Sequence, residues 1–491
     1  MLFEAFRRMR DEHPDEAAFL VTAGDRSLPI CWRHFTDDIE TVSHLVLSLG
    51  GGTVGLLGEN SYEWVVAHAA LIFSGATVVP VDSNLTPSEI AGRLRFVGAR
   101  ILVHSAFYAE KARVTAGLMP GLVAAGFGGP LADRYLNEAR AALNAGAPSV
   151  WSRSSESIDR RRTAMLVFTS GTTSEPRGAE LTIESMEAFC ESASLELPMM
   201  LGQHSLMLLP LHHIFGVCTT YMMLSKGVAL GVCPDFRRIY DAVVRFRANF
   251  LFLVPALAEI LAARIEQHGS SAEESIGNPI DWILVGGAPL PRRTYERLQA
   301  LGVKMITGYG LTETSALYSI APLAGDAHVG SAGRASRLPG VETKVSPDGE
   351  LMIRGLGVMK GYYKASECTA RVIDPDGWFH TGDIGRIDED GFVWITGRAS
   401  RTIILSSGKK IAPEELEEKL LALPGIREAV VSGNGLSREI KAEVYASVPE
   451  ASVRRLIAAL NDTLPLYKRI RVVSVRDEPF PRTSSGKIRV G

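Results

Sequence analysis

Residues Met165 to Glu180 read MLVFTSGTTSEPRGAE, and the chain can be interpreted outward from this stretch. Leu166 to Phe168 have the pattern of a buried strand, and the residues from Thr169 to Gly178 then combine small hydroxyls, two glycines and one cation, Arg177. Small residues let backbone N–H groups and hydroxyls approach phosphate oxygens closely, and Arg177 adds positive charge. The stretch therefore predicts a loop that binds a polyphosphate, with a plain polar surface loop as the alternative. A Walker loop is disfavoured because no Gly-Lys-Ser/Thr follows at the required spacing.

The composition of the whole chain limits its class. At 491 residues it is too long for one compact core, so two or more domains are expected. The formal net charge of −3 lacks the clustered basic excess of nucleic-acid-binding proteins. The first residues mix both signs of charge, unlike a signal peptide, and we find no apolar run long enough to span a bilayer. We expect a cytoplasmic protein.

The five cysteines are scattered without CxxC pairing, which argues against a zinc site and a disulfide framework. We expect reduced core thiols at Cys31, Cys190, Cys218, Cys233 and Cys368.

The segment before the loop alternates helical and strand-like patterns, as in a layered α/β domain. Ser61 to Phe73 is amphipathic and starts with a capping Ser, and it lies between two apolar strand patterns, so a βαβ unit is predicted. The weakly periodic part from Thr115 to Ala147 predicts a connection on the surface. The other predicted elements are helices at Phe3–Arg10 and Trp32–Leu49 and strands at Thr53–Leu57 and Thr77–Val81.

Three apolar patterns follow the loop. Leu206 to Gly216 reads LMLLPLHHIFG, and from the residues alone a partly buried, hydrogen-bonded histidine pair is the favoured interpretation. Asn249 to Ala263 has helical spacing and predicts a core helix, followed by a polar loop at His268–Asn278. Trp282 to Leu290 reads WILVGGAPL, a strand ending in glycines where a ligand could approach, although a tight turn explains them nearly as well.

Val303 to Ser315 reads VKMITGYGLTETS, a short strand that leads into a glycine-rich turn. Chemistry on a nucleotide needs an aromatic face for the base, a hydroxyl near a phosphate and a carboxylate for Mg²⁺. Tyr309, Thr312 and Glu313 supply these three groups within five residues. A strand followed by a turn with a capping Thr is an equally good structural account of the pattern alone.

The later segments predict two different architectures. Gly349–Tyr363 and Gly377–Gly397 alternate apolar and polar positions and predict short antiparallel strands in a small barrel or sheet, with Asp383 in a turn. After Arg398 the composition changes. The rest predicts a small α/β domain with helices at Pro413–Leu423 and Val453–Leu464 and strands at Glu428–Ser432, Lys441–Val448 and Arg471–Val475. Its tail, PRTSSGKIRVG, has the composition of a disordered end.

In this order, the motifs resemble those of the adenylate-forming superfamily, which contains acyl-CoA synthetases, adenylation domains and beetle luciferases. The family loop usually reads Ser/Thr-Ser-Gly-Thr-Thr-Gly-x-Pro-Lys-Gly, and here Ser174 replaces a Gly and Arg177 a Lys. Arg retains the charge and adds donors. The stretches IILSSGKKIAPEELEE (Ile403–Glu418) and LPLYKRI (Leu464–Ile470) look most like fatty acyl-CoA synthetases.

The resemblance implies site roles for residues that match the family motifs. Lys487 would bridge the acid carboxylate and the α-phosphate, Glu313 would hold Mg²⁺, and Ser400 would be the hinge pivot, where the family commonly has Asp or Lys. Further catalytic residues would be Arg177, His213 and Thr312. The acid pocket would include His213, Phe215, Gly286 and Gly308. ATP or AMP would contact Thr169, Ser170, Gly171, Thr172, Thr173, Gly287, Ala288, Gly308, Tyr309, Gly310, Asp383 and Arg398.

The resemblance also implies an α/β fold with a large N-terminal domain at residues 1–398, built from layered α/β subdomains and a small β-barrel-like sheet. A hinge at 399–401 and a small, mobile α+β C-terminal domain at 402–491 would follow. The implied activity converts a carboxylic acid, a medium- or long-chain fatty acid, into acyl-AMP with ATP and Mg²⁺, and then transfers the acyl group to CoA.

Two alternatives stay open at this point. A freestanding adenylation enzyme would pass an acyl or aryl group to the phosphopantetheine of an acyl carrier protein. The second alternative is a nucleotide-binding sensor that lacks catalytic activity, because Ser174 departs from the family loop. No charged residue stands out as a partner for an α-ammonium group, so amino acids are disfavoured as substrates.

Overall fold

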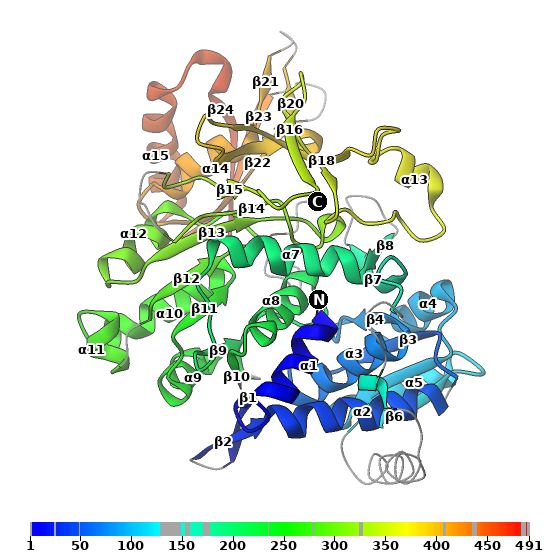
Figure 1. The fold of residues 1–491 in the computed structure, drawn as a ribbon. Helices are drawn as coiled ribbons and strands as arrows, with labels where there is room; N and C mark the ends of the chain where they lie inside the picture. Colours follow the sequence, from blue (N-terminus) through cyan, green and yellow to red (C-terminus); the bar gives the residue numbers. More distant parts are fainter. Residues whose placement is uncertain are drawn as a thin grey trace.

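The computed structural model describes residues 2–23, 26–48, 50–127, 149–152, 158–169, 177–233, 235–277, 280–323, 328–405, 409–434, 439–482 and 488. Figure 1 shows the chain coloured from its N-terminus to its C-terminus. The predicted loop residues Ser170, Gly171, Thr172 and Thr173, and the predicted catalytic Lys487, lie outside these ranges.

The predicted phosphate-loop strand belongs to a sheet of order β6-β5-β3-β4-β7-β8. Its members are parallel except β8, which pairs antiparallel with β7. The bounds are β3 (Thr53–Leu57), β4 (Thr77–Val81), β5 (Ile101–Ser105), β6 (Val123–Phe127), β7 (Thr163–Thr169) and β8 (Arg177–Thr182). The predicted connection at Thr115–Ala147 is wrong in part, because β6 within it extends this sheet by pairing with β5.

Helix α3 (Tyr62–Ser74) confirms the predicted βαβ unit. It connects the parallel strands β3 and β4, and the Ser61 side chain caps it by accepting a hydrogen bond from the N–H of Trp64. Almost every residue of α3 is buried, so the predicted amphipathic character of this helix is wrong. The other helices of the first half are α1 (Leu2–Glu12), α2 (Trp32–Ser48), α4 (Pro87–Val97), α5 (Ala109–Gly117), α7 (Ile183–Glu196) and α8 (Ile214–Ser225), with short 3₁₀ turns at Ala106–Tyr108 and Val150–Ser152.

A second sheet, of order β2-β1-β10-β9, joins the N-terminus to the middle of the chain. Strand β1 pairs antiparallel with β2 and parallel with β10, so this sheet combines strands from the N-terminal segment with strands from the middle of the chain. The bounds are β1 (Ala17–Ala23), β2 (Arg26–Cys31), β9 (His204–Met207) and β10 (Ala229–Val232).

The third sheet, of order β11-β12-β13-β14-β15, carries the glycine-rich strand ends. The predicted helix at Asn249–Ala263 is wrong at its start: Phe250 to Leu253 form β11, and α10 begins at Pro255. The predicted loop at His268–Asn278 contains the short helix α11. The bounds are β11 (Phe250–Leu253), β12 (Trp282–Val285), β13 (Met305–Tyr309), β14 (Ser319–Ile320), β15 (Arg334–Ala335), α9 (Ile239–Phe246), α10 (Pro255–His268), α11 (Ala272–Ile276) and α12 (Arg292–Ala300), with a 3₁₀ turn at Phe236–Arg238.

The predicted antiparallel strands form a sheet of order β16-β17-β18-β19. Asp383 was predicted in a turn, but it lies within β18, just before a register shift between Ile384 and Gly385. The bounds are β16 (Val341–Val345), β17 (Glu350–Gly355), α13 (Ser366–Ala370), β18 (Phe379–Ile387) and β19 (Val393–Arg398).

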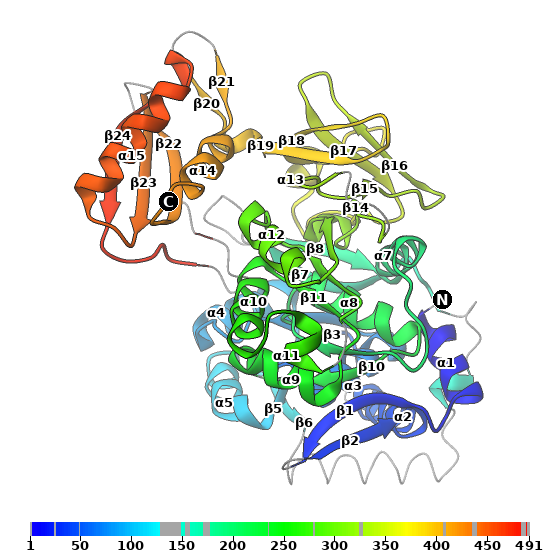
Figure 2. The ribbon, with the colours of Figure 1, turned by 90° about the vertical axis from the view of Figure 1, so that its left-hand side faces the viewer.

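The C-terminal segment forms a separate lobe, joined to the rest where β19 ends (Figure 2). Its own hydrophobic core draws on residues from Ile403 to Ile470. The exact boundaries at 398 and 402 stay a prediction. The bounds are β20 (Ile403–Ile404), β21 (Lys410–Ile411), α14 (Pro413–Leu421), β22 (Ile426–Asn434), β23 (Glu439–Ala446), α15 (Glu450–Thr463) and β24 (Ile470–Arg476), with 3₁₀ turns at Ala399–Arg401 (η6) and Leu466–Lys468.

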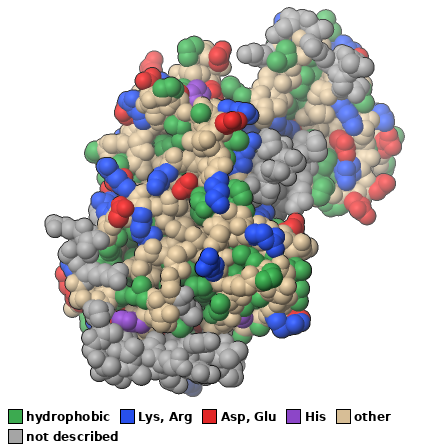
Figure 3. Space-filling view, turned by 90° about the vertical axis from the view of Figure 1, so that its right-hand side faces the viewer, with side chains coloured by type: hydrophobic (Ala, Val, Ile, Leu, Met, Phe, Trp, Pro, Cys, Tyr) green, Lys and Arg blue, Asp and Glu red, His purple; other side chains and the backbone are tan. Residues whose placement is uncertain are grey.

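The cysteines are free thiols, as expected; Cys190, Cys218 and Cys233 are buried, whereas Cys31 and Cys368 are partly exposed. Burial raises the pKa of Cys233 to about 11. Figure 3 shows one face on which cationic, anionic and hydrophobic side chains are interspersed. Within the described ranges, no helix combines the length and the apolar character needed to cross a membrane.

Candidate active site

The ends of the predicted phosphate loop lie side by side. Thr169 ends β7 and Arg177 begins β8, and the two residues are paired in the strand register. The Thr169 hydroxyl donates to the Arg177 carbonyl oxygen over 3.5 Å. Leu166 and Val167 are buried and anchor β7 in the core. The strand pair therefore fixes the positions of Thr169 and Arg177, the two described residues that flank the predicted loop.

The predicted adenosine residues Tyr309, Asp383 and Arg398 meet at one point. The Tyr309 hydroxyl, at the end of β13, donates to Oδ2 of Asp383 over 2.5 Å. Arg398 Nε lies 2.7 Å from Oδ1 of the same carboxylate, because Asp383 and Arg398 are partners in the β18 and β19 register. Burial, followed by the charge of Asp383, raises the pKa of Tyr309 well above its usual value. The phenol is thus a neutral donor.

The turn after β13 places Thr312 and Glu313 in the 3₁₀ turn Thr312–Thr314 (η5). It needs glycine at position 310, because a Cβ there would lie 2.1 Å from the Ala316 carbonyl oxygen. Oε1 of Glu313 accepts a hydrogen bond from the Tyr362 hydroxyl over 2.8 Å. The Glu313 carboxylate is therefore held by a side chain outside its own motif.

Tyr362 also contacts the phosphate-loop cation. The Arg177 guanidinium lies 5.5 Å from the centre of the Tyr362 ring, within cation–π range. Burial, with the Glu313 charge second, raises the pKa of the Tyr362 hydroxyl. Tyr362 is not among the predicted site residues, because GYY ends a segment whose pattern indicates only strands. The tyrosine directly after a glycine was the one available hint.

The predicted acid-pocket residues Phe215, Gly286 and Gly308 also converge. A Cβ on Gly286 would lie 3.1 Å from Cζ of Phe215 and 3.3 Å from the Gly308 carbonyl oxygen. Gly287 has φ +77, a left-handed angle that favours glycine, and a Cβ there would face Val254 at 3.6 Å. Ala288 follows, partly exposed. The ends of β12 and β13 thus pack closely against the Phe215 ring, and the space beside Gly286 leaves little room for a side chain.

The two histidines precede α8. His213 is the N-cap residue of the helix that carries Phe215, and its ring centre lies 4.3 Å from that of His212. His212 Nε2 lies 3.6 Å from Asp82 Oδ1, and burial lowers the pKa of His212. His212 is therefore partly buried, as the residues alone suggested, but its buried Nε2 has no hydrogen-bond partner among the described residues. His213 shares the start of α8 with the predicted pocket residue Phe215.

The predicted hinge pivot Ser400 is exposed in η6. Its neighbours are tied to opposite lobes: Arg398 pairs with Asp383, whereas Arg401 pairs with Glu414 and Glu417 of α14 at 2.9 and 2.5 Å. Ser400 thus separates two anchored arginines.

The metal assignment can be tested against the side chains present. Among the described residues, no group of three or more His, Cys, Asp or Glu is placed to hold a metal ion. Mg²⁺ is commonly bound by one or two carboxylates together with substrate phosphates and water. Glu313, beside the phosphate-loop strand end, fits that use.

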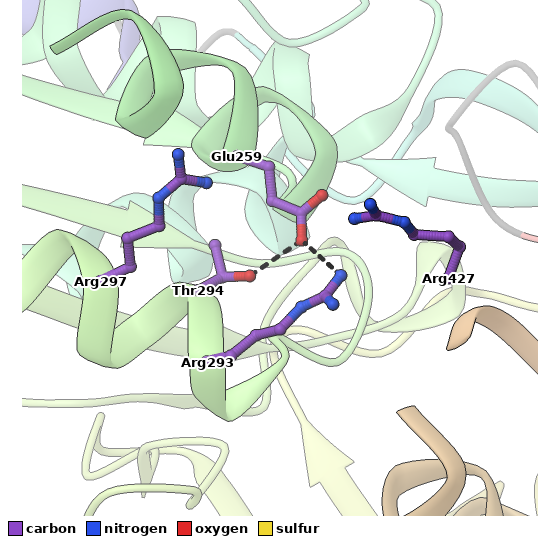
Figure 4. A pocket seen from close by; sticks show the side chains of 5 residues that line it. All are labelled: Glu259, Arg293, Thr294, Arg297 and Arg427. Atoms are coloured by element: carbon purple, nitrogen blue, oxygen red, sulfur yellow. Dashed lines mark hydrogen bonds and ion pairs between the residues drawn. The ribbon is translucent and has the colours of Figure 1, made fainter. Parts of the chain in front are cut away.

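A cavity of about 250 Å³ lies elsewhere, between α10, α12 and the C-terminal lobe. Figure 4 shows that Glu259 lies at its centre, in contact with Arg293 and Thr294, while Arg427 of β22 reaches toward it from the other lobe. None of the predicted site residues lines it.

The chain is similar to a known enzyme family and to several known proteins. The family model described as AMP-binding enzyme matches residues 6–363. The chain is 28% identical over 443 residues to the long-chain-fatty-acid–CoA ligase FadD15 of Mycobacterium bovis, covering 79% of this chain and 72% of that protein. It is 29% identical over 475 residues to the 2-succinylbenzoate–CoA ligase of Bacillus pumilus, covering 93% and 91%.

A feruloyl-CoA synthase from Amycolatopsis sp is 29% identical over 460 residues, which cover 90% of this chain and 88% of the relative. Among solved structures, ATP-bound MatB from Rhodopseudomonas palustris superposes with a TM-score of 0.84 at 25% identity, covering 99% of this chain and 97% of that one.

Proposed function

Because the chain belongs to the AMP-binding enzyme family, we propose that it is an AMP-forming acid–CoA ligase. The observation that carries the proposal is the meeting of Tyr309, Asp383 and Arg398 at the end of the strand that also leads to Glu313. A carboxylate beside an aromatic ring suits the ribose and base of a nucleotide. The resemblance of the motifs and the names of the relatives support the same activity.

In the first half-reaction, the acid carboxylate attacks the α-phosphorus of ATP, an acyl phosphate anhydride bond forms, and pyrophosphate leaves. Two anions must approach each other, so the protein contributes mainly positioning and neutralisation of charge. Arg177 and Thr312 would contact phosphate oxygens, and His213 would face the acid carboxylate. Lys487, which lies outside the described residues, is assigned from its motif to the carboxylate and the α-phosphate.

Glu313 would hold Mg²⁺, which when bound neutralises charge on the leaving pyrophosphate. The carboxylate already has a fixed orientation, because Tyr362 donates to one of its oxygens.

In the second half-reaction, the CoA thiol attacks the acyl carbonyl, a thioester forms, and AMP leaves. Rotation of the C-terminal lobe about Ser400 would withdraw Lys487 and admit the thiol. The anchoring of Arg398 and Arg401 to opposite lobes supports a pivot between them.

The acid is proposed to be a medium- or long-chain fatty acid. The groups placed around Gly286 and Gly287 are the Phe215 ring, Val254 and the Gly308 carbonyl oxygen. These surroundings suit an apolar tail, as does the resemblance of Ile403–Glu418 to fatty acyl-CoA synthetases. The relatives also include ligases named for aryl acids, so both classes belong in a substrate panel.

Replacement of Lys487 tests the proposed roles most sharply. Lys487→Ala should lower adenylate formation by at least about a hundredfold, because the neutralising charge is lost, whereas thiolysis of a preformed acyl adenylate should continue. Pyrophosphate exchange and CoA-dependent release of AMP measure the two steps separately. First-step activity equal to that of the unmodified protein would refute the assignment.

The same product assay decides the acceptor. Formation of acyl-CoA from free CoA supports the proposed acid–CoA ligase. If the acyl group is transferred only to the phosphopantetheine of a carrier protein, the carrier protein replaces CoA as the proposed acceptor. The cytoplasmic location stays a prediction.

A further inference from the structure

Tyr362 lies between two oppositely charged groups of the proposed site. Its hydroxyl donates to Glu313 Oε1 over 2.8 Å, and the face of its ring lies 5.5 Å from the Arg177 guanidinium. The side chain is 8% exposed, so these contacts are largely shielded from water. One tyrosine therefore contacts the predicted metal ligand with its polar end and the predicted phosphate cation with its apolar face.

The backbone around Tyr362 is fixed on both sides. The N–H of Glu180 donates to the Gly361 carbonyl and the N–H of Lys360 donates to the Glu180 carbonyl, each over 2.9 Å. The N–H of Tyr363 donates to the Gly178 carbonyl over 2.8 Å. The segment thus continues the pairing of β8, the strand that begins at Arg177.

The same segment is also joined to the η5 turn. The N–H of Met359 donates to the Glu313 carbonyl over 2.8 Å. Residues 359–363 therefore connect the strand after the phosphate loop with the turn that carries Glu313, and Tyr362 projects from this connection.

We propose that Tyr362 is a positioning residue for the adenylation step, keeping Glu313 oriented toward Mg²⁺ and Arg177 toward phosphate. A carboxylate and a guanidinium that contact the same tyrosine attract each other when partly buried, and a direct ion pair would neutralise both. Tyr362 contacts both groups through one neutral side chain, so its own contacts neutralise neither charge. This inference rests on the proposed function.

The test compares the binding of MgATP and AMP to Tyr362→Phe, which removes the hydroxyl and retains the ring. A hydrogen bond to a charged group corresponds to about tenfold in affinity or more. The Kd of MgATP should therefore rise about tenfold, while the Kd of AMP, which lacks the β- and γ-phosphates, should change less than about twofold. Calorimetry measures both. The matched control is Tyr363→Phe, whose hydroxyl faces the Val97 carbonyl at 3.5 Å and should leave both affinities unchanged.

A double variant shows whether Tyr362 acts through Glu313. In a Glu313→Gln background, Tyr362→Phe should weaken MgATP binding by less than about twofold further, because coupled residues give non-additive effects. If the two substitutions weaken MgATP binding independently, so that their fold-changes in Kd multiply, the proposal is overturned. The Glu313→Gln single variant should itself weaken MgATP more than AMP, which provides a second measurement if Tyr362→Phe folds poorly; equal weakening of both ligands would overturn the proposal.

The remaining outcomes separate the two proposals. An unmodified protein that performs no acid-dependent pyrophosphate exchange would refute the proposed function. An active protein whose Tyr362→Phe variant binds MgATP normally, or loses MgATP and AMP affinity equally, would refute only the positioning role. Unchanged thiolysis of a preformed adenylate by Tyr362→Phe supports it, since that step does not involve pyrophosphate.

Discussion

Asp383 is 3% exposed, and among the described residues its carboxylate accepts a hydrogen bond from the Tyr309 hydroxyl and pairs with the Arg398 guanidinium. A carboxylate can accept about four hydrogen bonds, and in the proposed function the ribose hydroxyls of the nucleotide donate to this one. Asp383→Asn should weaken AMP binding by about tenfold or more, because the amide has a single acceptor oxygen and leaves the Arg398 charge unpaired. Equilibrium titration with AMP measures the change.

Asp390→Asn is the matched control for this prediction. Its side chain is 72% exposed and lies in the turn between β18 and β19, so its loss of charge should leave AMP affinity unchanged. Equal affinities of the Asp383→Asn variant and the unmodified protein would contradict a role for Asp383 at the nucleotide.

The sequence identified Tyr309, Asp383 and Arg398 because each belongs to a short local motif with its own spacing. It did not identify Tyr362, whose partners are 49 positions away at Glu313 and far earlier in the chain at Arg177. Such a role depends on which strands become neighbours, and residue spacing carries little information about that.

Helices α3 and α10 show why one element could be predicted and another was misplaced. At α3 the capping Ser61 marks the start, and the side chain does accept from Trp64 N–H. Near α10, the apolar run Phe250–Leu253 fits a buried strand or a buried helix equally well by periodicity. Pro255, at the first position of the helix, was the local evidence for where α10 begins.

The packing of α3 on α8 makes stability depend on pH. His68 of α3 is fully buried, stacks on Trp64 and shares a 2.8 Å hydrogen bond with the Tyr221 hydroxyl of α8. Burial lowers the pKa of His68 to about 3 from its ordinary 6.5. Below about pH 6.5 the unfolded chain takes up a proton at this position and the folded protein does not. The free energy of unfolding should therefore fall as the pH falls, by up to about 1.4 kcal/mol per pH unit.

Denaturant unfolding of the unmodified protein and His68→Gln between pH 7 and pH 5 tests this expectation. The variant loses the buried imidazole, so the stability difference between the two proteins should shrink on acidification. The other titrating groups are common to both and cancel in the difference. A difference that stays constant between pH 7 and pH 5 would contradict the account of His68.

At the scale of the whole molecule, the C-terminal lobe has its own core and is joined to the rest by η6 (Figure 2). The hydrogen bonds of this turn run from Thr402 N–H to the carbonyls of Arg398 and Ala399, so they do not require the N–H of Ser400. Ser400→Pro should restrict rotation at this turn, since Pro fixes its own φ and disfavours a helical conformation of Ala399. One half-reaction should slow by at least about tenfold relative to the other.

Separate assays of pyrophosphate exchange and thiolysis measure this effect, with Ser400→Ala as the control that shortens the side chain and leaves the backbone free. Rates of both steps that change by the same factor in Ser400→Pro would argue against a pivot at this position. The change in composition after Arg398 predicted this boundary, but the orientation of the lobes depends on contacts between them, such as those of α14 with β19.

The central claim is that the molecule activates a carboxylic acid with ATP. Its most direct test is acid-dependent exchange of labelled pyrophosphate into ATP, measured with the full chain and Mg²⁺ across fatty, aryl and amino acids. The account predicts exchange with an apolar acid, strongest among medium- and long-chain fatty acids, and none without acid. Folded protein that binds ATP and yet exchanges pyrophosphate with none of the acids would contradict it.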